Sequence, residues 1–190
     1  MNTLFDITPT LPTGFSYKDN FITEAEEIHL VQVIGGLELT SMQFHEYTAK
    51  RKVLSFGRGW SFTEQQLKTG NPIPAEFSFL VERIAQHLSI PPETIAQFLI
   101  TEYPVGSVIN WHRDAPPFET IIGISLLSDC SFKLRPQEKE KQTRKATITL
   151  TVKPRSMYIM TGASKTDWQH CTTPLNTIRY ALTFRTLKYF

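Results

Sequence analysis

The second half of this sequence is a series of short β-rich runs, and this series limits the fold more than any other feature. From Phe98 onward, eight runs rich in β-branched and aromatic residues alternate with turn residues. In chain order they are FLITEY, SVINWH, TIIGISLL, SFKLRP, ATITLTV, SMYIMT, WQHCTT and IRYALTFRTL. Short strands at this spacing are typical of an all-β sandwich or barrel, so we expect one of these two architectures.

The first half of the sequence contains two helical patterns. Thr23 and Glu26 have the spacing of a capping box, and apolar residues recur at helical spacing until two glycines interrupt them. This predicts a helix over residues 23–35. A second apolar pattern at helical spacing begins after Pro74 and ends before Pro91, which predicts a second helix.

The other N-terminal residues show no clear period. Residues 1–20 predict an extended arm that runs over the surface. Residues 38–72 interleave aromatic side chains with basic ones and predict no regular element. Helices in the first half and strands in the second together predict a mainly β fold with flanking helices (α+β).

The length and composition fit one domain. A chain of 190 residues with 41% hydrophobic residues can bury one sizeable core. Two cysteines are too few for a disulfide scaffold or a four-cysteine zinc site, so a reducing compartment is the simplest interpretation. The N-terminus does not resemble a signal peptide, and no run of about 18 apolar residues occurs. We therefore expect a soluble cytoplasmic protein without a membrane span.

Positive charge is concentrated in one segment. The whole chain has a formal net charge of only +2, so any polyanionic partner would require a local basic surface. Residues 133–155 contain eight Lys and Arg against two Glu. The centre of this segment, QEKEKQTRK, has the composition of an exposed hairpin loop. It is either part of a binding surface or simply a solvated tip.

One short motif carries metal-binding chemistry. On a strand the side chains of His112 and Asp114 leave the same face, so an imidazole and a carboxylate converge. Two His and one carboxylate are the ligands of mononuclear non-haem iron(II) sites, which keep open positions for cosubstrate and oxygen. His170, near the end of a later run, is the natural candidate for the third ligand.

The last predicted strand has a polar face. Arg179, Thr183 and Arg185 share one face, while Tyr180, Leu182 and Phe184 occupy the other. Arginines inside a small barrel are costly unless they meet anions, and guanidinium groups suit carboxylates. A dicarboxylate cosubstrate would supply the anions. Because six residues of straight strand cover about 20 Å, one arginine can instead serve the carboxylates beside the metal.

These motifs together resemble the AlkB family of iron(II)- and 2-oxoglutarate-dependent dioxygenases. The resemblance covers roughly residues 97–187, and it is carried by Thr101-x-Tyr103, His112-x-Asp114, His170 and Arg179-x5-Arg185 and by the segments RSMYIMTGASKTDWQH and RYALTFR. Fainter similarity upstream, in RKVLSFG and PIP, matches the nucleotide-recognition region of that family. The chain is most similar to a bacterial subgroup related to eukaryotic members that act on tRNA wobble bases.

The resemblance implies a fold and a division of the chain. The fold is a double-stranded β-helix, or jelly roll. A single dioxygenase domain would span residues 1–190. Residues 1–96 would form an N-terminal extension with helices and a nucleotide-recognition lid, and residues 97–187 the catalytic core.

The resemblance also implies the roles of particular residues. His112, Asp114 and His170 would bind Fe(II), and Arg179 would bind the distal carboxylate of 2-oxoglutarate with help from the Tyr103 hydroxyl. Arg185 would lie near the C1 carboxylate and Asp114. Thr101 stands where the family usually has Asn, so that contact is weakened or replaced. The cosubstrates would be 2-oxoglutarate and O2.

The expected substrate is an alkylated base in DNA or RNA. A flipped or single-stranded base would stack on an aromatic platform, for which Tyr47, Phe56 and Trp60 are the candidates. Phosphates would contact Lys50, Arg51, Lys52 and Arg58. The sequence after the Asp ligand is Ala115-Pro116-Pro117, which lacks the acidic residue that contacts the base in some DNA-repair members. Base preference is therefore not carried over.

Two other functions stay open. The same chemistry could act on a protein side chain, a tRNA modification or a small molecule, since the fold hosts many substrates. A non-catalytic binding module that keeps the barrel is the third hypothesis. We expect a monomeric oxidative demethylase that acts on nucleic acid, releasing the alkyl group as an aldehyde with succinate and CO2.

Overall fold

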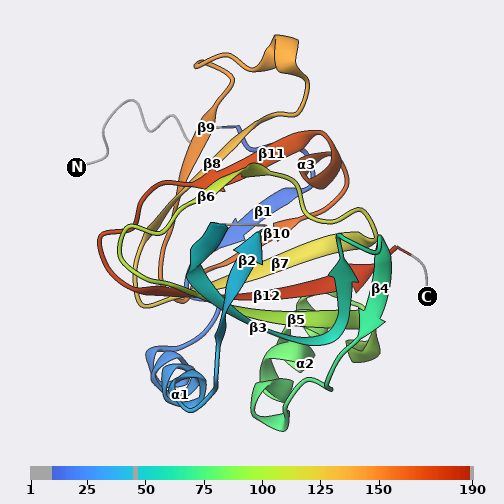
Figure 1. Ribbon diagram of the computed structural model, residues 1–190, viewed down its shortest axis with the longest axis vertical. Coiled ribbons are helices and arrows are strands. Elements are labelled where there is room, and N and C mark those ends of the chain that lie inside the picture. Colours follow the sequence, from blue (N-terminus) through green and yellow to red (C-terminus); the bar gives the residue numbers. More distant parts are fainter. Residues whose placement is uncertain (1–9, 45–46, 189–190) are drawn as a thin grey trace.

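The computed structural model describes residues 10–44 and 47–188 and consists mainly of two antiparallel sheets (Figure 1). The larger sheet has eight strands. They are Phe15–Lys18 (β1), Thr40–Phe44 (β2), Tyr47–Ser61 (β3), Gln66–Thr69 (β4), Ile95–Tyr103 (β5), Phe118–Leu126 (β7), Met157–Met160 (β10) and Arg179–Leu187 (β12). Their order is β1-β10-β7-β12-β5-β3-β2, and β4 pairs with β3.

The smaller sheet has four strands and lies beside the larger one (Figure 1). They are Ile109–His112 (β6), Cys130–Pro136 (β8), Ile148–Val152 (β9) and Trp168–Thr172 (β11), in the order β6-β11-β8-β9. Each of the eight runs predicted from Phe98 onward is therefore a strand. The mainly β fold with flanking helices is confirmed.

Two helices cover the outer face of the larger sheet. Helix α1 spans Glu24–Gly35 and begins at the predicted capping box, in which the Glu26 amide donates to the Thr23 hydroxyl and the Thr23 amide donates to the Glu26 carboxylate. Helix α2 spans Ser78–Leu88 and follows a 3-10 turn at Ala75–Phe77 (η1). Both predicted helices are confirmed. Among the described helices, none has the length and apolar character needed to cross a membrane.

Three more short helical segments were not predicted. They are Pro92–Thr94 (η2), Lys139–Lys141 (η3) and Ala163–Thr166 (α3). Each contains only three or four residues, so it carries no helical period in the sequence.

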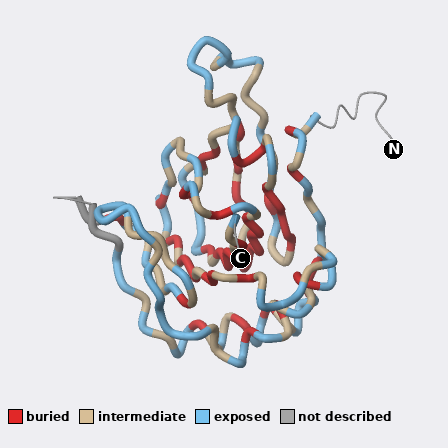
Figure 2. The backbone as a smooth tube through the Cα atoms, turned by 90° about the vertical axis from the view of Figure 1, so that its right-hand side faces the viewer, coloured by how far each residue is buried: buried red, intermediate tan, exposed pale blue. Residues whose placement is uncertain are grey.

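The larger sheet separates two hydrophobic clusters. The cluster on its helical side contains Leu182 and Phe184 of β12, and the ring of Phe184 stacks on that of Phe98 at 4.5 Å. The other cluster lies toward the smaller sheet and contains Ala181 of β12 with Phe132 of β8. Figure 2 shows the buried backbone concentrated where the sheets pack. Alternation along the strands therefore assigns each side chain to one of the two cores.

Two N-terminal predictions were wrong. The segment predicted as an extended arm includes β1, which pairs with β10 at the sheet edge. Residues 38–72, predicted to be irregular, contain β2, the long strand β3 and β4. The period of β3 is hidden because its two faces meet different surroundings: Phe56 is buried in the helical-side cluster, while Arg51 on the other face reaches a cavity. Residues 1–9 lie outside the described part.

A packing constraint operates within the larger sheet. On β7, Gly123 pairs with Tyr158 of β10 and Thr183 of β12. A Cβ atom on Gly123 would lie only 2.2 Å from the Tyr158 ring. The absence of a side chain at position 123 therefore makes room for the aromatic ring at position 158.

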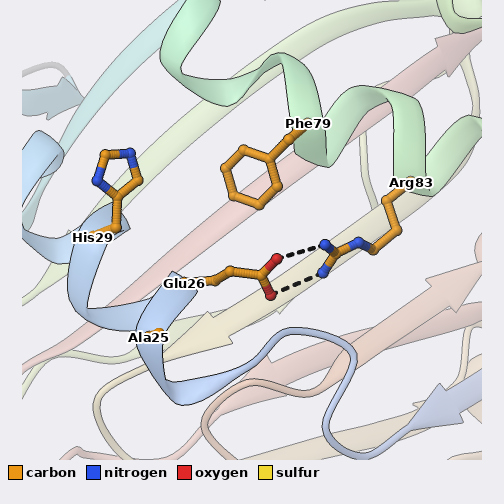
Figure 3. Close-up of a pocket in the computed structure, with 5 residues that line it drawn as sticks. All are labelled: Ala25, Glu26, His29, Phe79 and Arg83. Atoms are coloured by element: carbon orange, nitrogen blue, oxygen red, sulfur yellow. Dashed lines mark hydrogen bonds and ion pairs between the residues drawn. The ribbon is translucent and has the colours of Figure 1, made fainter.

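The two helices are joined by a salt bridge between their side chains. The Arg83 guanidinium on α2 donates to both carboxylate oxygens of Glu26 on α1, at 2.9 and 2.5 Å (Figure 3). The Glu26 side chain is 25% exposed. Hydrogen bonds from Arg83 lower the pKa of Glu26 from 4.5 to about 2.

We predict that this salt bridge contributes to stability in a pH-dependent way. Because the pKa of Glu26 is lower in the folded state, its contribution is complete above the ordinary value of 4.5 and disappears as the pH falls toward about 2. Glu26→Gln should lower the melting temperature at pH 7 by about 2–4 °C, for a loss of about 1 kcal/mol. The difference should shrink by pH 3, as measured by circular dichroism. Glu82→Gln, at an exposed position of α2, is the control. An equal effect of Glu26→Gln at both pH values would contradict the prediction.

Candidate active site

Two adjacent strands of the smaller sheet bring three potential metal ligands together. His112 ends β6, His170 lies in β11, and the two residues are direct partners in the antiparallel register. Asp114 follows β6 by two residues. One donor atom from each of the three side chains lies within 4.8 Å of the others. The three ligands proposed from the sequence therefore meet at one point.

The Asp114 carboxylate is held by an arginine through one oxygen. The Nε and Nη2 atoms of Arg185 donate to Oδ1 at 3.0 and 2.7 Å, which leaves Oδ2 directed toward His170. Burial raises the pKa of Asp114, but the charges of Arg185 and of the two histidines outweigh it and lower the pKa to about 2. Asp114 is therefore ionised at neutral pH and can act as a metal ligand.

The surroundings of the two imidazoles fit metal binding. Nδ1–H of His112 donates to the carbonyl oxygen of Asn110 at 2.8 Å, so Nε2 is the nitrogen available to a metal. Burial and the neighbouring His112 lower the pKa of His170 to about 4, so His170 is neutral at neutral pH. Its ring also stacks on Phe132 at 5.2 Å.

The environment of His170 fits a metal ion. His170 is only 7% exposed, yet its Nδ1 atom makes no hydrogen bond to a described residue. Nε2 lies 3.6 Å from Oδ2 of Asp114, which is too long for a hydrogen bond. A buried imidazole without a polar partner is unusual, and a cation between these two atoms would supply one. Two imidazoles with one carboxylate are a ligand set for Fe(II).

The other arginine of β12, Arg179, is buried and hydrogen-bonds to a neutral side chain. Arg179 is 3% exposed, its Nε atom donates to Ser125 Oγ at 2.8 Å, and its guanidinium lies 5.3 Å from the centre of the Tyr103 ring. Within the part of the chain that the structure describes, no Asp or Glu forms an ion pair with it. Because a buried unpaired charge is costly, this arrangement fits an anion bound at the guanidinium.

Both arginines face one cavity of about 940 Å³. Its wall includes the three candidate metal ligands and, on β5, Thr101 and Tyr103. Tyr103 is the register partner of Arg179, and Thr101 lies two residues before Tyr103 on the same face of β5. Arg185 contacts the carboxylate beside the metal site rather than sharing one small anion with Arg179, as the length of a straight strand led us to expect.

The proposed substrate-binding residues divide into two groups. Arg51 and Trp60 line the cavity. Phe56 does not, because its ring is buried on the opposite face of β3 and stacks on Phe98 at 5.8 Å. Its assignment to the aromatic platform is therefore corrected: Phe56 is a core residue. Tyr47 begins β3, but its side chain lies outside the described residues.

Sequence analysis missed several polar residues that line the cavity or hold its arginines. Ser125 on β7 accepts from Arg179, and Gln97 on β5 accepts from Arg185 at 2.7 Å. Tyr158 also lines the cavity, and burial raises its pKa above the ordinary range of a phenol. Gln97 is the register partner of Arg185. Only the strand register brings these residues together, and no sequence motif specifies it.

The sequence model of the 2OG-Fe(II) oxygenase superfamily matches residues 14–185, nearly the whole chain. The chain belongs to this superfamily. The oxygenase uses Fe(II) and 2-oxoglutarate, and its ligand set matches the pattern of two His and one carboxylate found in such sites.

Comparison with individual proteins shows that the oxygenase is similar to a protein of the ALKBH group. It is 27% identical over 173 residues to mouse (Mus musculus) tRNA (carboxymethyluridine(34)-5-O)-methyltransferase ALKBH8. The match covers 86% of the chain but only 25% of that much longer relative. This similarity agrees with the AlkB-like motifs found in the sequence.

Two solved structures share the fold. The structure of OsALKBH1 superposes with a TM-score of 0.73 at 14% identity, covering 94% of this chain and 99% of the other. A prolyl hydroxylase from Trichoplax adhaerens, in complex with a hypoxia inducible factor peptide, gives 0.64 at 13% identity, covering 92% and 83%. The predicted double-stranded β-helix is therefore confirmed.

Different residues of the oxygenase would bind Fe(II) and 2-oxoglutarate. His112, Asp114 and His170 would hold Fe(II), while Arg179 and Tyr103 would offer positive charge and a hydroxyl group to a carboxylate of 2-oxoglutarate, with Ser125 orienting Arg179 from behind. When bound, iron supplies the activation of O2 coupled to decarboxylation of 2-oxoglutarate. The chain contributes orientation and a partly enclosed cavity.

We predict that Arg185 positions Asp114 for metal binding. Arg185→Gln should weaken Mn(II) binding roughly 10- to 100-fold because the carboxylate loses the group that orients it. Isothermal titration calorimetry with Mn(II) would measure this. Arg58→Gln, which removes an exposed charge from β3, is the control. If Arg185→Gln binds Mn(II) as tightly as the wild type, the positioning role is wrong.

We predict that Arg179 is a binding residue and not a stabilising one. Arg179→Met should weaken 2-oxoglutarate binding to the Mn(II)-loaded protein roughly 100-fold or more. The melting temperature of the ligand-free protein should stay the same or rise, because the substitution removes a buried charge without a carboxylate partner. Calorimetry and circular dichroism test the two parts. A large fall in melting temperature with unchanged 2-oxoglutarate binding would refute both.

Proposed function

We propose that this oxygenase removes N-linked alkyl groups from bases of nucleic acids. The observation that carries the proposal is the lining of the cavity of about 940 Å³, where the candidate iron ligands lie together with an aromatic side chain and basic side chains. Trp60 from β3 and Lys50 and Arg51 from the same strand line it. An aromatic face suits a base and cationic groups suit the phosphates beside it.

The cavity is large enough for both a cosubstrate and a base. Ligand pockets usually have volumes of about 300–1,000 Å³, and this cavity has about 940 Å³. A base inside a duplex cannot reach such a site, so the target would be flipped out or already single-stranded. Trp60 would stack on one side of that base, with His112 on the other.

The four basic residues proposed for phosphate contact are not equivalent. Lys50 and Arg51 line the cavity. Lys52 forms an ion pair with Glu102 at 3.2 Å on the neighbouring strand, which reduces its availability for phosphate. Arg58 is exposed and does not line the cavity. We therefore assign phosphate contact near the target base to Lys50 and Arg51.

The proposed reaction balances with the cosubstrates. One oxygen atom of O2 enters succinate as 2-oxoglutarate loses CO2, and the other forms a hydroxyl group on the alkyl carbon bound to the base nitrogen. The resulting hemiaminal breaks its C–N bond, which releases the aldehyde and returns the proton to the base.

A second candidate is the oxidation of a modified base in tRNA. The name of the mouse relative specifies a tRNA uridine, and this supports RNA as a substrate class for the AlkB-like branch. The Pro116-Pro117 corner after the Asp114 ligand supports a pocket that differs from those with an acidic base contact. Both candidates use the same site and differ in the group that is oxidised.

We predict that succinate production is stimulated by one class of oligonucleotide. Protein loaded anaerobically with Fe(II) would receive 2-oxoglutarate and O2 with N-methylated or etheno-modified DNA and RNA, or with tRNA. Succinate and the mass of the base would be measured together. His112→Ala should abolish both signals, whereas His29→Ala, on the exposed side of α1, should retain them.

Different outcomes separate the hypotheses. Mass loss from the base supports dealkylation, and a gain of one oxygen in tRNA supports the second candidate. Turnover that depends on His112 but is not stimulated by any nucleic acid would refute the nucleic-acid assignment and favour a protein or small-molecule substrate.

A further inference from the structure

The smaller sheet has a polar outer face that the proposed reaction does not use. On β8, Phe132 and Leu134 point into the core between the sheets, so Lys133 and Arg135 point outward. The register places Cys171 and Thr149 beside Lys133 and places Gln169 beside Arg135. None of the four strands contains Asp or Glu.

The hairpin between β8 and β9 extends this face. It projects from the top of the molecule in Figures 1 and 2, and Figure 2 shows its tip as exposed. Lys139, Lys141, Arg144 and Lys145 are all exposed there. Lys141 forms an exposed ion pair with Glu138 at 2.9 Å, so the other three carry the charge of the hairpin. We call Arg113, Lys133, Arg135, Lys139, Arg144 and Lys145 the basic face.

The positive excess of the whole chain is located here. Residues 109–113, 130–152 and 168–172 together contain seven Lys and Arg against two Glu, a formal charge of +5. All other residues contain 13 Lys and Arg against 16 Asp and Glu, a formal charge of −3. The molecule therefore presents one basic side on an otherwise acidic chain, which favours oriented binding of a polyanion.

Two arginines of the basic face are held in place. The Arg135 guanidinium lies 4.3 Å from the centre of the Trp111 ring, and its Nε atom donates to Gln169 at 2.7 Å. Arg113 donates to the carbonyl oxygen of Thr166 at 2.7 Å. An ordered guanidinium loses less conformational entropy when it binds a phosphate than a free one does.

The basic face continues directly from the mouth of the cavity. Strand β6 carries His112 toward the candidate metal site, while Trp111 and Arg113, its neighbours in sequence, lie at the cavity rim. From β6 to β9 the sheet is about 14 Å wide at the usual strand spacing. Measured along the axis of a duplex, this width corresponds to about four phosphates of each strand.

We infer that the basic face binds the phosphate backbone of nucleic acid beyond the target base. It would be a second contact surface, separate from Lys50 and Arg51, and would make longer polynucleotides bind more tightly than short ones. The inference rests on the proposed function for the identity of the polyanion, but backbone binding itself requires no turnover.

A pair of variants with equal net charge tests the inference. Lys133→Gln/Lys145→Gln removes two charges from the basic face, and Lys18→Gln/Lys188→Gln removes two exposed charges elsewhere. Binding of fluorescent, unmodified DNA and RNA about 20 nucleotides long would be measured by anisotropy over a range of salt concentrations. Melting temperatures would verify that both variants fold.

We expect only the basic-face variant to bind more weakly, by roughly tenfold at moderate salt, with a salt slope lower by about 1.4–1.8 for two lost phosphate contacts. Succinate production with a modified trinucleotide should be unchanged in this variant, while production with the longer strand should fall. The two proposals can fail separately. If the basic-face variant loses oligonucleotide binding but the wild type oxidises no base, the basic face is supported and the proposed function is refuted.

Two results would overturn the inference. Equal binding by both variants would show that the charges of the basic face do not contact the backbone. Selective loss of binding to vesicles of anionic phosphatidylglycerol, with oligonucleotide binding unchanged, would assign the face to a lipid surface instead.

Discussion

The structure depends on the requirement that β12 be apolar on one face and cationic on the other. This strand lies between β5 and β7 in the larger sheet. Leu182 and Phe184 pack under the helices, while Arg179 and Arg185 reach the cavity from the opposite face. A shift of one residue in register would bury the two guanidinium groups in the helical-side core, which is energetically prohibitive. The fold and the site are therefore specified by the same alternation.

The two positive charges on this strand, one buried and one half-buried, are compensated in two different ways. Arg185 has a protein partner, since Asp114 accepts two hydrogen bonds from it. Arg179 has only the neutral Ser125 and the aromatic face of Tyr103 among the described residues. The first arrangement fixes a metal ligand in place before any metal binds, and the second leaves an electrostatic requirement that a carboxylate ligand meets. The protein alone therefore positions the metal ligand and the carboxylate-binding arginine before either ligand binds.

Much of this architecture could be predicted from the sequence, because short strands with turn residues between them carry a local signal. The His112–Asp114 spacing and the alternation in β12 are also local, and the structure places these side chains on one cavity. The long strand β3 was missed because both of its faces are covered in part, which removes the simple polar and apolar alternation. The same hidden alternation explains why Phe56 was placed on the substrate side. Ser125 and Gln97 could not be found, since their roles arise only from strand register.

The contact between Gly123 and Tyr158 has a consequence for how this fold can change over time. A methyl group at position 123 would collide with the aromatic ring, and a smaller residue at position 158 would leave an empty volume on the cavity wall. Neither position can therefore accept a substitution independently of the other. The two positions are therefore expected to covary among homologous chains. A residue larger than glycine at position 123 should be accompanied by a residue smaller than tyrosine at position 158. The pair of residues present would then set the depth of the cavity.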